Sequence, residues 1–248
     1  MYVVVGPGAM GFFSLYGMLQ THLTLDQVTE ISGSSAGALA ALCFLLQVPI
    51  SKCLSMKTAD VFKPNIKSFL TTYGFVPRKR ILKILIEFFE RNWTFRELFE
   101  YTGKPLHIAV SSVNPKRTLY YSVKNAPDDS VIETLATSMS IPIMFSPERK
   151  NGSILFDGSV YERTPGGPFS HLPKDHVLQF IVEYPDESVN TKNGLFQFIA
   201  TFLQSIISLR YEYDYPTKKV KTRASDMFNF SASHDTMLKM YIQGCCNV

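Results

Sequence analysis

Short apolar runs alternate with longer ones along the first fifth of the chain. Tyr2–Val5 and 28–32 are rich in β-branched or apolar residues, and each is followed by a glycine, which is typical of a buried strand entering a tight turn. The segment 9–20 has helical composition, and 36–46 is apolar on every side, which predicts a fully buried helix. The order strand, turn, helix, strand, turn, helix predicts the opening of an α/β sheet.

The rest of the chain continues this pattern less regularly. The segment 51–76 mixes short apolar patches with proline and glycine and predicts no definite element. Helices are expected over 80–92, 131–140, 195–209 and 235–241, and strands over 106–113, 118–123, 154–156 and 177–184. No stretch has the composition of an interdomain linker. We therefore expect one three-layer α/β/α domain over 1–248, with a mainly parallel central sheet.

Composition narrows the class of protein. A chain of 248 residues that is 46% hydrophobic can bury a full core. The 25 Lys and Arg against 21 Asp and Glu are too few for a dedicated nucleic-acid binder, so we expect no nucleic-acid partner. The four cysteines lack C-x-x-C spacing, which predicts no metal site and favours a reducing, cytoplasmic compartment. We expect neither a signal peptide nor a transmembrane helix.

One short motif carries the strongest chemical signal. Gly33-Ser34-Ser35-Ala36-Gly37 is a G-x-S-x-G sequence between a predicted strand and a predicted helix. The flanking glycines allow a sharp reversal that exposes the Ser35 hydroxyl above the sheet. The following helix directs backbone N–H groups and its positive end toward the place where negative charge would develop. This context favours a nucleophilic serine.

A glycine-rich loop, Gly6-Pro7-Gly8-Ala9-Met10-Gly11, follows the first strand and allows two interpretations. As G-x-G-x-x-G it could bind NAD(P), with Glu30 as the acidic partner of the ribose. A glycine loop at a helix N-terminus also binds other anions, including a tetrahedral oxyanion. The serine turn occupies the place where a second strand-to-helix turn should approach a ribose. The oxyanion interpretation is therefore favoured, and we expect no cofactor.

A third signal comes from the middle of the chain. The segment Ser138–Pro147 precedes Phe156-Asp157-Gly158, where the aspartate ends a short predicted strand and projects into a cleft at the sheet edge. Glycine loop, serine motif and Asp-Gly pair occur in an order that resembles the patatin-like phospholipases. The similarity runs from about Tyr2 to Pro165 and includes the proline-containing segment 137–147.

The resemblance implies an α/β domain whose catalytic core covers 2–165, with 166–248 completing the same fold. It implies that Ser35 is the nucleophile and Asp157 its general base. It also implies that the backbone N–H groups around Gly8 and Ala9 form the oxyanion hole. The implied reaction is hydrolysis of fatty-acyl esters in phospholipids or acylglycerols, without a metal or cofactor.

Three positions depart from the family pattern. Met10 stands where the family commonly has Arg or Lys, Ser159 replaces a second glycine after Asp157-Gly158, and Arg163 stands where an asparagine often occurs. These departures keep open a weakly active or inactive relative that only binds lipid or a membrane partner.

A Ser-Asp-His triad is the alternative to a catalytic dyad of Ser35 and Asp157. His171, His176 and His234 follow Asp157 in the order of a Ser-Asp-His triad, but that fold needs several strands before its nucleophile. Only two predicted strands precede Ser35, so we favour the dyad. Since a carboxylate is a weak base for a serine hydroxyl, we expect an apolar setting around Asp157, with Phe156 and Val160 as neighbours.

Membrane contact is expected of a lipid hydrolase, which would place it at the periphery of a membrane. The candidates are the apolar helices at 81–89 and 195–209 and the basic clusters at 78–80 and 218–221.

Overall fold

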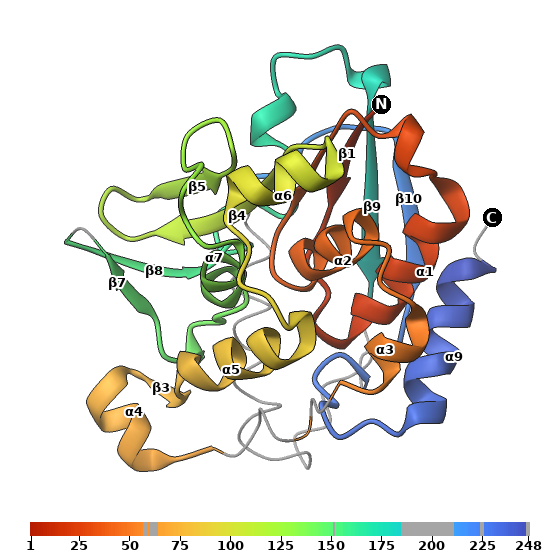
Figure 1. Cartoon of the computed structure of the whole chain (residues 1–248). Coiled ribbons are helices and arrows are strands. Elements are labelled where there is room, and N and C mark those ends of the chain that lie inside the picture. The colour runs from red at the N-terminus through yellow and green to blue at the C-terminus, as the bar shows by residue number, and fades with distance from the viewer. Residues whose placement is uncertain (57–58, 60–63, 151, 185–210, 224–225, 247–248) are drawn as a thin grey trace.

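A mainly parallel sheet forms the centre of the molecule (Figure 1). The computed structural model describes residues 1–56, 59, 64–150, 152–184, 211–223 and 226–246. The strands of this sheet are β1 (Tyr2–Val5), β2 (Glu30–Gly33), β4 (Leu106–Ser112), β5 (Arg117–Tyr121), β7 (Glu148–Lys150), β8 (Ser153–Asp157), β9 (Val177–Glu183) and β10 (Thr217–Lys221). Their order is β10-β9-β1-β2-β4-β8-β7, and β5 also pairs with β4.

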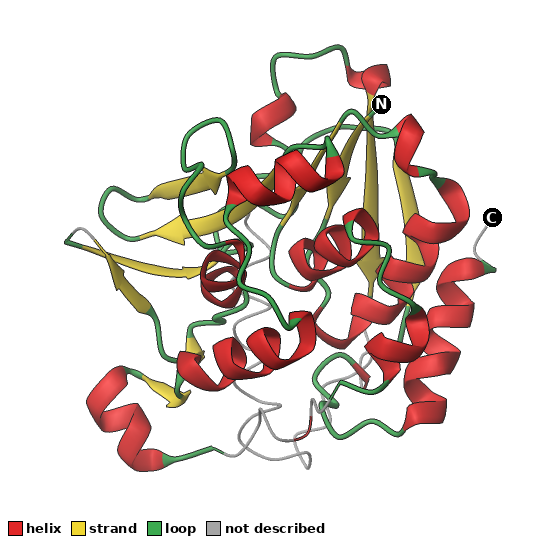
Figure 2. Ribbon diagram, in the orientation of Figure 1, coloured by secondary structure: helices red, strands yellow, loops and turns green. Residues whose placement is uncertain are grey.

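Strand directions confirm the predicted fold class. The five strands from β10 to β4 run parallel, whereas β5, β7 and β8 pair in antiparallel fashion. Helices flank this sheet (Figure 2). They are α1 (Phe12–His22), α2 (Ala36–Leu45), α3 (Ile50–Leu54), α4 (Ile66–Thr72), α5 (Arg78–Phe89), α6 (Phe95–Thr102), α7 (Val131–Ser138) and α9 (His234–Cys245). Beside them, β3 (Gly74–Val76) and β6 (Ile143–Phe145) form a second, two-stranded parallel sheet.

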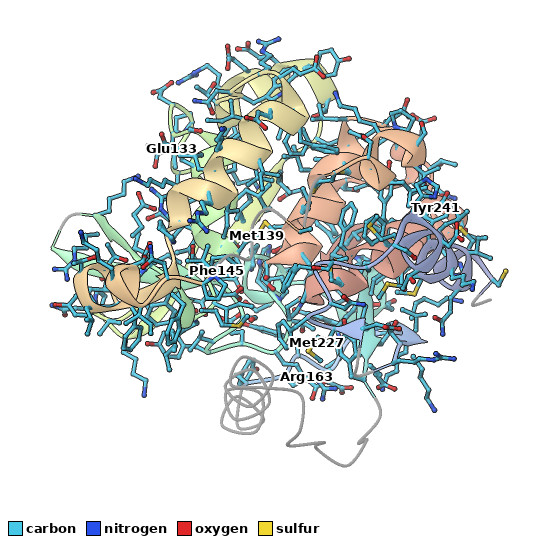
Figure 3. The ribbon with its side chains drawn as sticks, turned by 90° about the horizontal axis from the view of Figure 1, so that it is seen from below. Glu133, Met139, Phe145, Arg163, Met227 and Tyr241 are labelled. Carbon is cyan, nitrogen blue, oxygen red and sulfur yellow. The ribbon has the colours of Figure 1, made fainter. Side chains whose placement is uncertain are left out.

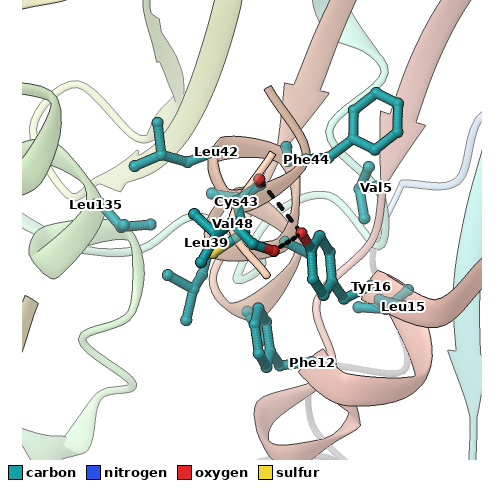
Figure 4. Close-up of a cluster of buried hydrophobic side chains, with 14 of the residues drawn as sticks. Val5, Phe12, Leu15, Tyr16, Leu39, Leu42, Cys43, Phe44, Val48 and Leu135 are labelled. Atoms are coloured by element: carbon teal, nitrogen blue, oxygen red, sulfur yellow. Dashed lines mark hydrogen bonds between the residues drawn. The ribbon is translucent and has the colours of Figure 1, made fainter. Parts of the chain in front are cut away.

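The main hydrophobic core lies between the sheet and the helices α1, α2 and α7. Every residue of α2 is buried, as its continuous apolar sequence predicts. Figure 4 shows this core, where the Tyr16 hydroxyl donates hydrogen bonds to the carbonyls of Val48 and Cys43. Those bonds satisfy the one polar group of a fully buried aromatic ring.

Alternation along β1 divides the core between the two faces of the sheet. Val3 and Val5 belong to the main core, whereas Val4 packs on the opposite face with Phe169, Val177 and Tyr215. The helix expected over 195–209 lies outside the described residues. Within the described ranges, no helix combines the length and apolar character needed to span a bilayer.

Several elements differ from the sequence expectations. The helix expected from residue 9 begins at Phe12, after a 3-10 turn over Ala9–Gly11. The segment without a predicted element contains α3, α4 and β3, and α6 was not predicted although Thr94 and Glu97 form a capping box before it. The basic cluster at 218–221 belongs to the edge strand β10. There Lys219 pairs with Glu183 at 2.8 Å.

Candidate active site

The ends of two strands meet on one edge of β4. Gly33, the last residue of β2, pairs with Ile108, and Asp157, the last residue of β8, pairs with Val110. Both Ile108 and Val110 also pair with β5, which occupies the other edge of β4. Since β2 and β8 must then share one edge, their ends approach each other with partners two residues apart, about 7 Å along β4. This register brings the serine turn and the aspartate together.

The chain reverses sharply after β2, and this turn requires glycine where one backbone segment approaches another closely. Ser35 has φ of 52° and ψ of −129°, a conformation that an L-residue adopts only under strain of about 1–3 kcal/mol. A Cβ on Gly37 would lie 2.2 Å from the carbonyl oxygen of Gly6, and one on Gly33 would lie 2.5 Å from Cα of Ala38. Only glycine therefore fits at either position of the motif.

Around this turn the remaining motif residues are buried. Ser34 is fully buried, and its N–H donates to the carbonyl of Val5 at 3.4 Å. Ser35 is 5% exposed, and Ala36 begins α2, so its N–H has no acceptor within the helix.

Ser138, at the end of α7, joins the turn to the aspartate. Its hydroxyl accepts a hydrogen bond from the N–H of Ser35 at 2.9 Å, and its carbonyl accepts one from the N–H of Gly158 at 3.3 Å. The neighbouring carbonyl of Ser140 accepts from the N–H of Asp157 at 2.9 Å. The sequence placed Ser138 in the family-like segment without indicating this role, because the contact links positions about a hundred residues apart.

Asp157 is 2% exposed, and Ser159 donates hydrogen bonds to its carboxylate. Oδ1 accepts hydrogen bonds from the N–H of Ser159 at 2.9 Å and from its hydroxyl at 2.6 Å. The setting is therefore partly polar, whereas we expected apolar neighbours to dominate. A glycine at position 159 could supply only the first of these bonds. A Cβ on Gly158 would lie 2.0 Å from the carbonyl oxygen of Ala109, so the Asp-Gly pair passes tightly against β4.

The glycine loop presents two backbone donors. Gly6 anchors its start by donating to the carbonyl of Phe180, and Met10 donates to the carbonyl of Met227 at 3.0 Å. Gly11 donates to the carbonyl of Gly8 at 2.6 Å. Within the described part of the chain, the N–H groups of Gly8 and Ala9 donate to no protein acceptor. Two neighbouring N–H groups in this state are the donors that an oxyanion needs.

Tyr184 fixes the orientation of this loop from the end of β9. Its hydroxyl donates to the carbonyl of Gly8. In a trans peptide the carbonyl and the following N–H point in opposite directions, so this bond turns the N–H of Ala9 away from Tyr184. Burial raises the pKa of the Tyr184 phenol, which keeps the hydroxyl protonated as a donor. A Cβ on Gly11 would lie 2.6 Å from this hydroxyl, so a larger residue there would displace the Tyr184 side chain.

An open apolar pocket lies beside Ser35. Ser35 is the only polar side chain among the described residues that line it. The wall includes Ile81, Ile84 and Leu85 of α5, Phe12, Phe13, Phe230, and Met139 and Phe145, which are labelled in Figure 3. Met10 also lines the pocket, so the position where the family commonly has a cation contributes an apolar side chain here.

Glu30 cannot serve as the partner of a ribose at the glycine loop. It pairs with Tyr2 at the start of β1, whereas the loop follows the opposite end of that strand. Its carboxylate lies 2.7 Å from Nζ of Lys124 and 2.7 Å from Nε2 of His107. Burial acts to raise the pKa of Glu30, but the hydrogen bonds from Lys124 and His107 outweigh it and lower that pKa. The dinucleotide interpretation does not fit this geometry.

The histidines and Arg163 lie outside the site. All five histidines fall within the described residues, and none lines the pocket beside Ser35. Arg163 pairs with Glu212 at 3.0 Å, with both side chains about half exposed. In the described ranges no three His, Cys, Asp or Glu side chains form a cluster that could hold a metal ion.

Fold and site together define an α/β protein with a glycine-flanked serine turn above an apolar pocket. A family model described as patatin-like phospholipase matches residues 3–169, and the chain belongs to the patatin-like phospholipase family. The crystal structure of VipD from Legionella pneumophila is similar in fold, with a TM-score of 0.65 and 14% identity, covering 99% of this chain and 65% of that one.

Two relatives are similar in sequence. Probable lipid hydrolase 463L of Invertebrate iridescent virus 6 is 25% identical over 178 residues, 66% of this chain and 61% of the viral protein. Triacylglycerol lipase 4 of Saccharomyces cerevisiae is 27% identical over 267 residues, 93% of this chain and 28% of the yeast protein. This chain thus spans less than two thirds of the length of either relative.

Proposed function

We propose that this chain hydrolyses fatty-acyl esters of glycerolipids, with Ser35 as nucleophile and Asp157 as general base. The observation that carries the proposal is the meeting of β2 and β8 on one edge of β4, beside the apolar pocket. The described residues of the wall carry no charge, which suits a fatty-acyl chain because a head group buried among them would lack polar partners. The printed names of the viral and yeast relatives, a lipid hydrolase and a triacylglycerol lipase, support the same substrate class.

In the proposed mechanism Asp157 accepts the hydroxyl proton of Ser35, and the serine oxygen attacks the ester carbonyl. The N–H groups of Gly8 and Ala9 stabilise the tetrahedral oxyanion, where each donor contributes about 10²–10³ in rate. Collapse breaks the ester bond, and Asp157 returns the proton to the departing alcohol. Water then attacks the acyl-serine with Asp157 as base, which releases the fatty acid and restores Ser35.

A second candidate function is lipid binding without cleavage. The apolar Met10 in place of a loop cation favours it, because the site then lacks one charge that could stabilise an anionic group. The backbone donors of the loop do not depend on that side chain. Both candidates place a phospholipid or acylglycerol in the same pocket, at the periphery of a membrane, and they differ only in chemistry at Ser35.

The test combines turnover with covalent labelling of the purified full chain. Wild type should hydrolyse a short-chain ester and bind a fluorophosphonate at Ser35, as located by peptide mass spectrometry. Ser35→Ala should lose labelling and more than about a thousandfold in rate, and Asp157→Asn should lose a similar factor. The matched controls are the exposed Ser170→Ala and Asp214→Asn, which should retain wild-type rates.

Two results would overturn this proposal. Equal rates in wild type, Ser35→Ala and Asp157→Asn would remove both residues from the reaction. A wild type that neither turns over nor reacts with the probe, yet binds a fluorescent fatty acid, would support the binding function instead.

A further inference from the structure

Helix α4 exposes one apolar face, although its Phe69 is partly buried and packs on Phe75 with ring centres 4.6 Å apart. Ile66 is 71% exposed and Leu70 is 72% exposed, and Tyr73, which ends the helix, is 58% exposed. Their spacing of four and three residues places all three on one face. The polar Ser68 is buried instead, and its hydroxyl donates to the carbonyl of Gly74 at 2.9 Å. A surface helix normally turns its apolar face inward, so this exposed apolar face requires an explanation.

Cations predominate near this face, although Lys83 pairs with Glu87 at 3.7 Å and Arg78 with Glu148 at 3.8 Å. Residues 64–86 contain five Lys and Arg and no Asp or Glu, although the whole chain has 25 cations and 21 acids. Lys67, Lys79 and Lys83 are exposed. From β7, the exposed Arg149 adds another cation, with its guanidinium 5.3 Å from the centre of the Tyr73 ring. An apolar stripe bordered by cations complements an anionic surface with an apolar interior.

The two-stranded sheet joins this face to the pocket. β3 follows α4 directly and pairs with β6, through Gly74 with Ile143 and Val76 with Phe145. Ile143 is 36% exposed, whereas Phe145 lines the pocket beside Ser35. After β3 the chain enters α5, which forms another wall of that pocket. Figure 1 shows α4 and β3 projecting together as one corner of the molecule below α5.

We propose that Ile66, Leu70, Tyr73 and Ile143 form a lipid-contact face that inserts into an anionic bilayer, with the surrounding cations on its head groups. This inference rests on the proposed function for its occupant, because an enzyme that cleaves phospholipids must meet them in a bilayer. The apolar residues of this face differ from the apolar candidates in the sequence, which were the stretch of α5 and the segment 195–209, whereas Lys79 belongs to the basic cluster expected at 78–80. Insertion of this face would place the bilayer next to α4, which β3 and β6 connect to the wall of the pocket.

The test measures binding of the full chain to vesicles by flotation. Wild type should bind vesicles of phosphatidylcholine with phosphatidylglycerol, and weakly those of phosphatidylcholine alone. The double variant Ile66→Ser/Leu70→Ser should bind at least about tenfold more weakly, because each substitution removes a side chain that inserts into lipid. Ile242→Ser on α9 is the matched control, since it removes an isoleucine that is 48% exposed at another place, and it should bind like wild type.

A charge variant tests the second half of the inference. Lys67→Glu/Arg149→Glu should lose binding to anionic vesicles, and raised salt should weaken wild-type binding in the same way. The double serine variant should cleave a lipid presented in vesicles at least about tenfold more slowly, yet cleave a dissolved short-chain ester at the wild-type rate. Unchanged melting temperatures would show that these exposed substitutions leave the fold intact.

Distinct outcomes separate this inference from the proposed function. Loss of vesicle binding in the variants of a protein that cleaves no ester would retain the lipid-contact face and overturn the hydrolase. Wild-type binding by the double variant would overturn the face and leave the hydrolase standing. If light scattering shows a wild-type dimer that the double serine variant converts to monomers, the face contacts a second copy and the inference is wrong.

Discussion

Replacing Tyr184 by phenylalanine tests whether the glycine loop works through its backbone. The substitution removes one hydroxyl and keeps the ring. It breaks the bond that holds the carbonyl of Gly8 and with it the orientation of the Ala9 N–H. If that N–H stabilises the oxyanion, Tyr184 is a positioning residue for catalysis, although it contacts no reacting atom.

The expected effect of Tyr184→Phe on stability and on kcat follows from the hydrogen bonds that the loop keeps. The carbonyl of Gly8 still accepts from the N–H of Gly11 at 2.6 Å, so unfolding should become easier by only about 0.5–1.5 kcal/mol. For a chain of this length that lowers the melting temperature by about 2–5 °C. Complete loss of an oxyanion donor costs about 10²–10³ in rate, and a donor that is present but misoriented should cost about 10- to 100-fold in kcat. KM should change less than about twofold, since the ground state scarcely uses this donor.

The assay is steady-state hydrolysis of a dissolved short-chain ester by wild type, Tyr184→Phe and Tyr241→Phe. The last is the matched control, because it removes a tyrosine hydroxyl that donates at 2.8 Å to Gln20, near the end of α1 that is opposite the loop. A Tyr184→Phe enzyme with wild-type kcat would refute the reasoning. A raised KM with unchanged kcat would also refute it, since that pattern reports substrate binding in the ground state.

Three further predictions concern folding and pH. Gly37→Ala should lower the melting temperature by about 6–12 °C, because its Cβ meets backbone oxygens at 2.2 and 2.4 Å that cannot move aside. Ser159→Ala removes the hydroxyl bond to the Asp157 carboxylate, so the acid limb of the kcat/KM profile should move up by about one pH unit; an unmoved limb would exclude Asp157 as the base. Burial lowers the pKa of His107 below its usual 6.5, against the opposing effect of Glu30, so folding stability falls as pH drops below about 6.5. Between about pH 7 and about pH 5, the melting temperature of His107→Gln should therefore fall less than that of wild type.

Local patterns were sufficient where a segment's surroundings follow from its own sequence. The all-apolar 36–46 predicted the buried α2, and the β-branched run before the glycine loop predicted β1, because such segments are stable only inside a core. The same reasoning predicted no element at α4, where Ile66 and Leu70 face outward while Phe69 packs on Phe75. It also failed for β10, a lysine-rich strand that is formed by pairing with β9 at the sheet edge.

Some features of the candidate site were indicated by the local sequence, and others depend on long-range contacts. The spacing of G-x-S-x-G indicated a sharp turn at Ser35, and the structure explains it by the close approach of Gly37 to the end of β1. Nothing in the local sequence around Ser138 or Tyr184 indicated contact with the serine turn or the glycine loop. Those contacts join residues separated by 103 and 176 positions.

By itself the sequence determined the α/β class, the order of its first strands and helices, and the three short segments that carry the candidate chemistry. These features depend on hydrophobic periodicity and on glycine at tight turns, which act over a few residues. Only the tertiary structure decided that β2 and β8 share one edge of β4, that Tyr184 orients the loop, and that α4 exposes an apolar face. Strand register and long-range packing set these features, and neither is encoded in any single segment of the chain.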